Sequence, residues 1–398
     1  MNLSKKAEQI SPSLTLAIDA KAKKMKAEGI DVIGFGAGEP DFNTPLNIQE
    51  AAIKAIKEGY TKYTPTSGIK ELKEAICKKF GDDNKLFYKP SQIIVSTGAK
   101  QCLANAFQAI LNPGDEVIIP CPYWVSYPEL VKLADGVPVF IETTEENKFK
   151  YSVDKLKKAI TPNTKAIIVN SPGNPTGTVY TKEELMDIAL FAKENDLIII
   201  SDEIYEKLIY NSDIQHISIG ALSEDAYNRT ITINGVSKSY AMTGWRIGYA
   251  ACGSEKIIKL MTNIQSHYSS NPNSIAQYAS YEALVGNQDS MKHMIEEFKK
   301  RRNYMVDKIN KMKYISCIKP EGAFYVMINI SKILDKKVDG RLIETSLNFS
   351  DILLEKENVA VVPGCAFGVD NYVRLSYATS LNNIEIGLNR IQHFLNIL

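Results

Sequence analysis

The feature that most constrains the fold is a regular alternation of short apolar runs with longer stretches of helical periodicity, which begins near Gln92. The runs are rich in β-branched residues and span 93–95, 116–119, 137–141, 166–169, 197–200 and 230–233. Continuous apolar runs separated by helical patterns are typical of parallel strands that helices cover on both faces. The sequence therefore predicts an α/β fold with a mostly parallel sheet.

Two further patterns predict helices. Thr181 and Glu184 have the spacing of a capping box at the start of one helix between the strands. After Gly286, apolar residues recur at helical spacing in a stripe of Met291, Met294, Ile295, Phe298, Met305, Ile309 and Met312. We expect a long amphipathic helix whose methionines pack in a core. A shorter mixed α and β segment follows, in which 359–362 and 372–376 are predicted strands.

Length and charge limit the possible classes of protein. The chain has 398 residues, of which 44% are hydrophobic, so it can bury a large core and exceeds one typical compact domain. Its 47 Lys and Arg residues nearly balance 46 Asp and Glu residues, which gives a formal net charge of +1. Such a chain has no overall field to attract nucleic acid or an acidic membrane. We therefore expect neither as a partner.

The N-terminal segment and the cysteines favour a cytoplasmic location. The N-terminus carries Lys5, Lys6 and Glu8 and lacks the apolar stretch of a signal peptide, and no run approaches the length that spans a bilayer. Six cysteines are scattered without a Cys-x-x-Cys pair, and four histidines are equally dispersed. This pattern predicts reduced thiols in a cytoplasmic protein. It offers no metal-ligand spacing in the sequence, although distant residues can still converge, and we expect no metal.

Several motifs follow one another along the chain. The segment from Gly235 to Gly248 reads GVSKSYAMTGWRIG and contains Lys238 and Arg246. The others are GEPDF at 38–42, the segment at 63–68, SPGNPTG at 171–177, DEIY at 202–205 and YVRLS at 372–376. In order and spacing the chain resembles the class I aminotransferases over nearly its whole length, and within them the aspartate aminotransferases most.

The resemblance implies fold-type I of the pyridoxal-phosphate-dependent transferases. In that fold a large cofactor-binding domain is followed by a smaller α/β domain, and an N-terminal arm is part of the smaller domain. The corresponding ranges here are 46–286 for the large domain, 287–398 for the smaller domain and 1–45 for the arm. The resemblance also implies pyridoxal 5'-phosphate as cofactor and a homodimer with shared active sites. Tyr63 matches a tyrosine that reaches the cofactor phosphate of the neighbouring subunit.

Lys238 and Asp202 are the central catalytic candidates. A lysine after a strand is most often a solvated surface charge, but the resemblance implies that Lys238 binds the cofactor covalently and then serves as general acid and base. Burial and a nearby cation such as Arg246 favour the neutral amine that this role needs. Asp202 follows the run 197–200, where a parallel sheet presents its carboxyl ends to a ligand. A buried carboxylate there keeps a pyridine nitrogen protonated.

Other residues surround the cofactor in the resembling family. Tyr205 and Asn174 match donors to its phenolic oxygen, and Trp124 matches a tryptophan that stacks on the pyridine ring. A strand-to-helix turn can present free backbone N–H groups to a phosphate, and arginine suits bidentate phosphate contacts. The residues expected to hold the phosphate are Gly98, Ala99, Lys100, Ser237 and Arg246.

Arg374 lies inside a strand-like run, where a charge is out of place without an anionic partner. We expect it to bind the α-carboxylate of the substrate, with support from Gly38, Asn174 and Trp124 as the resemblance implies.

Lys100 indicates the class of substrate. It places a cation in the first turn of a helix, where the macrodipole disfavours it unless an anion is near. In one subgroup of the resembling family, the residues matching Lys100 and Thr15 meet the distal carboxylate of the substrate. Members of that subgroup that use prephenate carry a basic residue just before the proline matching Pro12, and this chain has Ser11. The prediction is a dicarboxylic amino acid, with prephenate disfavoured.

These features together predict an aspartate aminotransferase that moves the amino group of L-aspartate to 2-oxoglutarate by a ping-pong mechanism. Alternatives within the fold are an aminotransferase for aromatic or neutral amino acids, a β-lyase and an aminocyclopropane-carboxylate synthase. A nicotinamide-dependent dehydrogenase fails because Glu39, Pro40 and Asp41 follow the glycines of 34–38 where a helix should begin. A regulatory ligand-binding protein of aminotransferase fold normally carries a DNA-binding module as well, and this chain has no basic segment that would form one.

Overall fold

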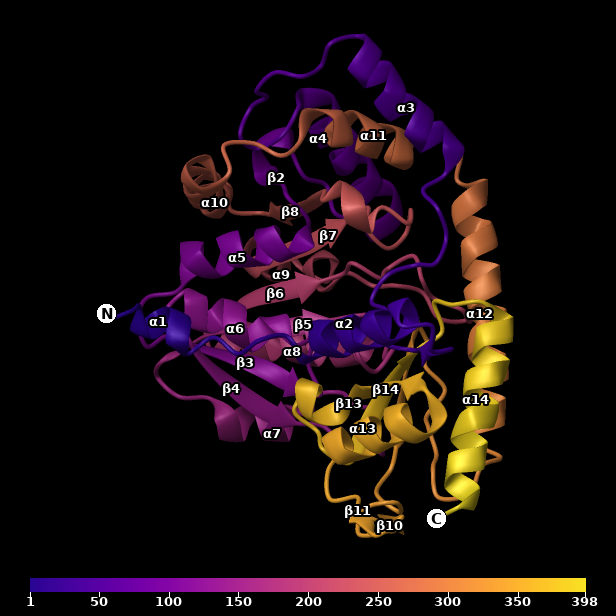
Figure 1. The fold of residues 1–398 in the computed structure, drawn as a ribbon. Coiled ribbons are helices and arrows are strands. Elements are labelled where there is room, and N and C mark those ends of the chain that lie inside the picture. The colour runs from indigo at the N-terminus through magenta and orange to yellow at the C-terminus, as the bar shows by residue number, and fades with distance from the viewer.

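The structure is a computed structural model that describes residues 1–398. A seven-stranded sheet forms its centre, and a smaller sheet lies beside it (Figure 1). The strands of the central sheet are β2 (Ile93–Ser96), β3 (Glu116–Cys121), β4 (Val137–Glu142), β5 (Thr164–Asn170), β6 (Ile198–Asp202), β7 (Thr230–Gly235) and β8 (Gly248–Cys252).

Their order across the sheet is β2-β8-β7-β6-β5-β3-β4, and only β8 runs antiparallel to its neighbours. This arrangement confirms the predicted α/β fold with a mostly parallel sheet. All six predicted runs form strands, whereas β8 was missed because its sequence, GYAAC, has no β-branched residue.

The register brings polar residues together at the carboxyl ends of the parallel strands. Asp202, the last residue of β6, lies opposite Asn170 at the end of β5 and Ile233 of β7. Ligands of open α/β sheets bind in the crevice outside these ends. The strand register therefore fixes where a site can form.

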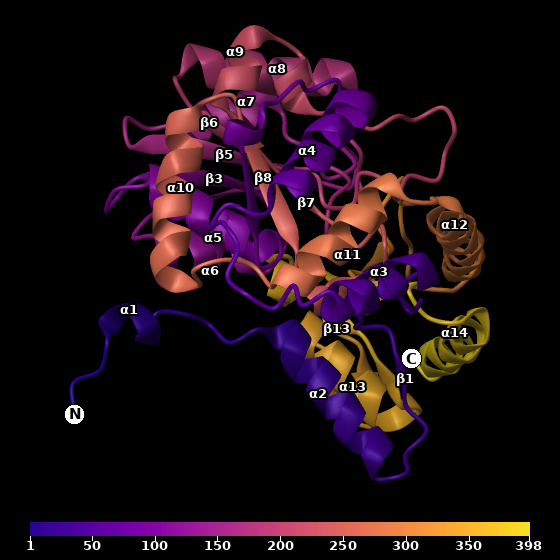
Figure 2. The same ribbon diagram turned by 90° about the horizontal axis from the view of Figure 1, so that it is seen from above.

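Helices cover both faces of the sheet (Figure 2). Successive residues of a strand point to opposite faces, so Val117 and Ile119 of β3 join one buried cluster and Ile118 joins another. One face packs against α5 (Ala99–Ile110), α6 (Ser126–Leu133) and α10 (Glu255–Tyr268). The other packs against α3 (Leu46–Lys57), α4 (Lys70–Lys79), α7 (Val153–Ala159), α8 (Lys182–Glu194), α9 (Glu224–Arg229) and α11 (Ser274–Val285).

Helix α8 begins with the predicted capping box. The Thr181 hydroxyl accepts a hydrogen bond from the Glu184 amide at 3.3 Å, and the Glu184 carboxylate accepts one from the Thr181 amide at 2.7 Å. Two amides without intrahelical acceptors are thus satisfied.

The smaller sheet is antiparallel, in the order β13 (Val362–Pro363), β14 (Tyr372–Ser376) and β9 (Tyr325–Asn329). Beside it, β1 (Ile33–Gly34) pairs in parallel with β12 (Val359–Ala360). The prediction of one strand over 359–362 is wrong, because β12 pairs with β1 whereas β13 pairs with β14, and Val361 separates them. The remaining elements are α1 (Lys5–Glu8), α2 (Leu14–Ala27), β10 (Lys337–Val338), β11 (Arg341–Leu342), α12 (Asp289–Ile309), α13 (Ser346–Glu357) and α14 (Leu381–Asn396).

The long helix after Gly286 is α12. Its residues Met294, Phe298 and Met305 are buried in the largest hydrophobic cluster, which confirms the core role of the stripe. The helix ends at Ile309, so Met312 lies beyond it but is still buried.

The N-terminal helix α2 lies against β1, β12 and β13, next to α13 in Figure 2. The domain boundaries at residues 46 and 286 stay a prediction, as does the cytoplasmic location. None of the helices combines the length and the apolar character that crossing a bilayer requires.

Candidate active site

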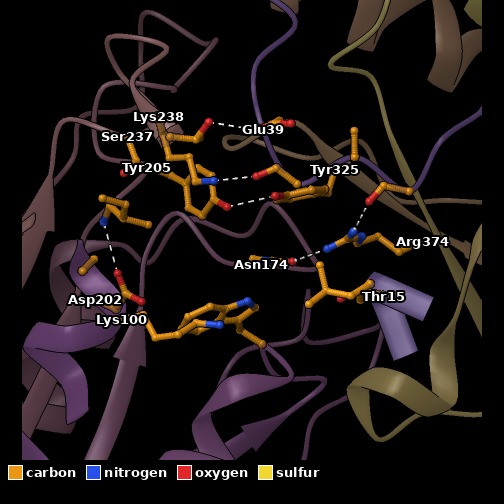
Figure 3. A pocket seen from close by; sticks show the side chains of 18 of the residues that line it. Thr15, Glu39, Lys100, Asn174, Asp202, Tyr205, Ser237, Lys238, Tyr325 and Arg374 are labelled. Carbon is orange, nitrogen blue, oxygen red and sulfur yellow. Dashed lines mark hydrogen bonds between the residues drawn. The ribbon is translucent and has the colours of Figure 1, made fainter. Parts of the chain in front are cut away.

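A cavity of about 600 Å³ lies at the carboxyl ends of β5 and β6, bordered by α2 and the smaller sheet (Figure 3). Most of the predicted site residues line it, although they come from segments far apart in the sequence. They are Thr15, Gly38, Ala99, Lys100, Trp124, Asn174, Asp202, Tyr205, Ser237, Lys238, Arg246 and Arg374.

Lys238 follows β7 and reaches into the cavity. Its Nζ donates a hydrogen bond to the Gly38 carbonyl at 2.5 Å. Burial lowers the pKa of its ammonium group, the Glu39 carboxylate acts to raise it, and the charges of Arg246 and Arg374 lower it further, to about 8. About a tenth of the amine is therefore neutral at pH 7 and about half at pH 8, far more than for an exposed lysine, and a nucleophilic lysine requires the neutral form.

Asp202 is a buried carboxylate at the end of β6. The Tyr127 hydroxyl donates to its Oδ2 at 2.7 Å, and the Ile204 amide donates to its Oδ1 at 3.3 Å. Burial raises the pKa of Asp202 to about 6, although both hydrogen bonds oppose the rise. The group is consequently an ionised, buried anion above pH 6, suited to pair with a protonated ring nitrogen.

Tyr205 and Tyr325 share a hydrogen bond between their hydroxyls at 2.9 Å. Burial raises the pKa of both phenols, and for Tyr205 the rise is large. Both remain neutral in the physiological range, so Tyr205 can donate a hydrogen bond to an oxyanion in the cavity. The ring of Tyr325 also lies 4.3 Å from the Arg374 guanidinium.

The first turn of α5, Ser237 and Arg246 form a group of donors suited to a phosphate. The first amides of a helix have no intrahelical acceptor and attract anions. Gly98 caps α5 with φ +84°, and a Cβ there would lie 2.5 Å from Nη2 of Arg246. Glycine is thus required for the guanidinium to approach the helix start. Arg246 makes no ion pair within the chain and donates only to the Thr243 carbonyl, at 2.9 Å.

Arg374 is fully buried in β14 and has no carboxylate partner. Its Nη1 donates to the Asn174 side-chain oxygen and its Nη2 to the Gly36 carbonyl, each at 3.0 Å. Its Nε has no acceptor at all. A buried cation without a counterion is costly, so this side chain is poised to bind a carboxylate in the cavity.

Lys100 and Trp124 lie together on another wall of the cavity. The Lys100 ammonium is 5.1 Å from the centre of the Trp124 ring. Burial and then the charge of Arg246 lower the pKa of Lys100, and no carboxylate of the chain pairs with it. Thr15 lines the cavity from α2, and its hydroxyl shares a hydrogen bond with that of Ser13 at 2.9 Å.

Two predicted residues do not line the cavity. Gly98 lies just beneath it, against Arg246. Tyr63 is 90% exposed and makes no hydrogen bond, so within one chain it is not part of the site.

Sequence reasoning missed several residues that line the cavity. Tyr127 follows Trp124 by three positions at the start of α6, and this spacing is a usable signal for a second inward aromatic residue. The Asn170 side chain accepts from the Asn174 amide at 2.8 Å and so fixes that turn. Tyr325 and the carbonyl of Gly36 gave no local signal, because only the fold brings them to Arg374.

Possible metal ligands converge at one other place. Glu203, Glu206 and His216 offer ligand atoms within 4.8 Å of one another. However, Lys79 forms an ion pair with Glu206, and the Asn84 amide donates to both carboxylates. Burial acts to raise the pKa of Glu206, but the charges of Lys79 and His216 hold it at about 2. The cluster is therefore an ion-pair network among the chain's own residues.

Comparisons with known proteins agree with this geometry. Residues 30–391 match the model of the family described as aminotransferase class I and II. An aspartate aminotransferase of Bacillus sp. (strain YM-2) is 55% identical over 98% of both chains. An aspartate/prephenate aminotransferase of Nitrosomonas europaea is 48% identical over the full length of both. The crystal structure of the aspartate aminotransferase from Rhizobium meliloti superposes with a TM-score of 0.96 at 42% identity, with both chains fully covered.

Proposed function

Because the chain belongs to the class I and II aminotransferases, and is therefore an amino-group transferase, we propose that it is an aspartate aminotransferase that uses pyridoxal 5'-phosphate. It transfers the amino group of L-aspartate to 2-oxoglutarate and yields oxaloacetate and L-glutamate. The observation that carries the proposal is Arg374, a buried guanidinium without a counterion in the same cavity as Lys238 and Asp202.

The residues of the cavity fit pyridoxal phosphate, which when bound supplies an electron-withdrawing ring that acidifies the α-hydrogen of the substrate. The Asp202 carboxylate holds a proton on the ring nitrogen. Ser237, Arg246 and the first amides of α5 hold the phosphate, and the Tyr205 hydroxyl donates to the ring oxygen. Lys238 anchors the cofactor and, once released, moves the α-proton as general acid and base.

The two ends of a dicarboxylic substrate have separate binding groups. Arg374 binds the α-carboxylate through its planar fork of donors, and Asn174 holds the guanidinium in place. We assign the distal carboxylate to Lys100, which makes no ion pair within the chain, and to Thr15, which lines the same cavity from α2. This division supports aspartate over neutral amino acids.

Prephenate is the alternative substrate with a specific observation in its favour, since the relative from Nitrosomonas europaea is named for both substrates. Ser11 stands before Pro12 in place of the basic residue expected for prephenate. Its amide donates to the Glu129 carboxylate at 3.0 Å, and its side chain carries no positive charge. Aspartate is therefore the preferred assignment.

We also propose a homodimer with shared active sites. Helix α3 exposes large apolar side chains, namely Leu46, Ile53 and Ile56, and the nearby Tyr63 is 90% exposed. Clustered exposed apolar residues are typical of protein interfaces. In such a dimer Tyr63 reaches the phosphate of the partner subunit.

The decisive measurement is the absorption spectrum of the protein with pyridoxal phosphate, before and after the addition of L-aspartate, L-alanine or L-phenylalanine. We expect aspartate to convert the bound cofactor to its amino form, and the others to convert it poorly. Lys238→Ala abolishes both the lysine-bound spectrum and transamination. If the spectrum shows lysine-bound cofactor that aspartate does not convert, only the substrate assignment is contradicted. If pyridoxal phosphate does not attach to the protein, the role of Lys238 is contradicted.

A further inference from the structure

The arginines of the chain divide into two groups. Those that pair with carboxylates are Arg229, Arg301, Arg341 and Arg390. The remaining three are Arg246, Arg302 and Arg374, which make no ion pair. Arg246 and Arg374 line the active-site cavity, where they are assigned to a phosphate and a carboxylate. Arg302 has the same unpaired character but lies elsewhere.

Arg302 lines a second cavity, of about 510 Å³, that shares no residue with the first. The cavity lies between α12, the segment around Pro320 and the segment that follows Tyr210. Its volume is within the range of small-molecule sites.

The Arg302 side chain is buried and held in one orientation. Its Nη1 donates to the Pro320 carbonyl at 2.9 Å, while its Nε and Nη2 donate to the Asn303 side-chain oxygen at 3.2 and 3.0 Å. The ring of Tyr210 lies 4.9 Å from the guanidinium. Since arginine has five N–H donors, two remain for a ligand. Burial without a counterion costs free energy that a bound anion would recover.

The other charges of the cavity are mainly positive. Lys299 and Lys319 line it, and Lys319 makes no ion pair. Lys299 has only a distant pair at 3.9 Å with Glu296, one turn back on α12. Glu321 is the single acid in the lining, and it already binds Lys148 at 3.4 Å. The three cations and one acid leave a net charge of +2, which a dianion neutralises.

We propose that this cavity is a binding site for a dianionic phosphoryl group, with Arg302 as its main ligand and Lys299 and Lys319 as supporting charges. Arginine suits phosphate through paired N–H donors, and lysine adds point charges around it. The site is separate from the cofactor phosphate site and stands independently of the proposed substrate.

The main chain connects the proposed site to the wall of the active-site cavity. Arg302 binds the carbonyl of Pro320, and the next two amides, of Glu321 and Gly322, donate to the Gly177 carbonyl at 3.0 and 2.9 Å. Gly177 has φ +68° and closes the turn that carries Asn174, and a Cβ there would overlap the ring of Pro320. Arg302 and the turn that carries Asn174 are therefore connected through Pro320 and Gly177.

The test is a titration of the protein, saturated with pyridoxal phosphate, with inorganic phosphate, followed by calorimetry and phosphorus NMR. We expect one saturable site that sulfate occupies as well and chloride at equal ionic strength does not. Arg302→Gln weakens phosphate binding by about ten- to a hundredfold, since one charged hydrogen-bonding group is lost. The exposed Lys319→Gln and the half-exposed Lys299→Gln weaken it by about threefold each and leave the fold intact, so they decide the matter if Arg302→Gln does not fold.

Two controls separate this site from others. Lys300→Gln removes a neighbouring charge of α12 that does not line the cavity, and it leaves the affinity unchanged. Arg246→Gln removes the arginine of the cofactor site. Three results would overturn the proposal. Phosphate binding could be lost only in Arg246→Gln, or it could be equally strong in the wild type and in all cavity variants. It could also be undetectable at phosphate concentrations on the order of tens of millimolar.

Discussion

At the scale of single residues, the charge of Glu39 affects the pKa of Lys238. The Glu39 carboxylate raises the pKa of Lys238, which burial otherwise holds down at about 8. We expect Glu39→Gln to move the pH midpoint for attachment of pyridoxal phosphate to lower pH and to make attachment at pH 7 several-fold faster. Stopped-flow absorbance of the cofactor-free protein across pH 6–10 measures this. An unchanged midpoint contradicts the effect of Glu39, and Glu28→Gln, at the exposed C-cap of α2, is the control.

The buried carboxylate of Asp202 lowers the free energy of unfolding of the cofactor-free protein. Its folded-state pKa of about 6 is above the unfolded value, so its ionised form destabilises the cofactor-free protein above that pH. Asp202→Asn should raise the free energy of unfolding at pH 7.5, by an amount on the order of 3 kcal/mol, while it abolishes transamination. The gain develops between about pH 4 and pH 6 and then levels off. Urea unfolding at several pH values tests it, and a pH-independent effect would exclude this cause.

At the scale of an element, the stability of α8 depends on its N-terminal cap, and the helix does not contact the active-site cavity. Thr181→Ala removes one half of the capping box and should lower the free energy of unfolding by about 1 kcal/mol. Thr181→Ser keeps the hydroxyl and should behave as wild type. Because no residue of α8 lines the cavity, kcat/KM should be unchanged in both variants. A loss of activity without a loss of stability would show that α8 positions the site.

At the scale of the whole molecule, the proposed shared sites make mixed dimers informative. A Lys238→Ala subunit has no catalytic lysine in its own site but still supplies Tyr63 to the site of its partner. A Tyr63→Phe subunit keeps its own lysine but supplies no Tyr63 hydroxyl to the site of its partner. After exchange of equal amounts, half of the dimers are mixed and each has one intact site, so activity at limiting cofactor should recover to about a quarter of wild type. The assay is transamination of aspartate before and after subunit exchange. No recovery, despite exchange measured by mass, contradicts shared sites.

Some strands and helix caps can be predicted from the local sequence pattern, whereas others form only because of contacts in the whole fold. β-branched runs predict six of the seven central strands, and the spacing of Thr181 and Glu184 predicts the cap of α8, because both signals depend on neighbouring residues. β8 was missed because Tyr, Ala and Cys next to Gly248 have no distinctive pattern, and its strand conformation comes from the ladders on both sides.

The sequence by itself determined the fold class and the motifs that place Asp202 at the end of a strand, Lys238 shortly after a strand and Arg374 within one. Only the tertiary structure decided that Tyr127 donates to Asp202, that the Gly36 carbonyl accepts from Arg374, and that Arg302 is buried without a carboxylate partner. These facts are distances between residues that are far apart in the chain. Local propensity and spacing contain no information about such distances, which are set when helices, strands and loops pack in the folded chain.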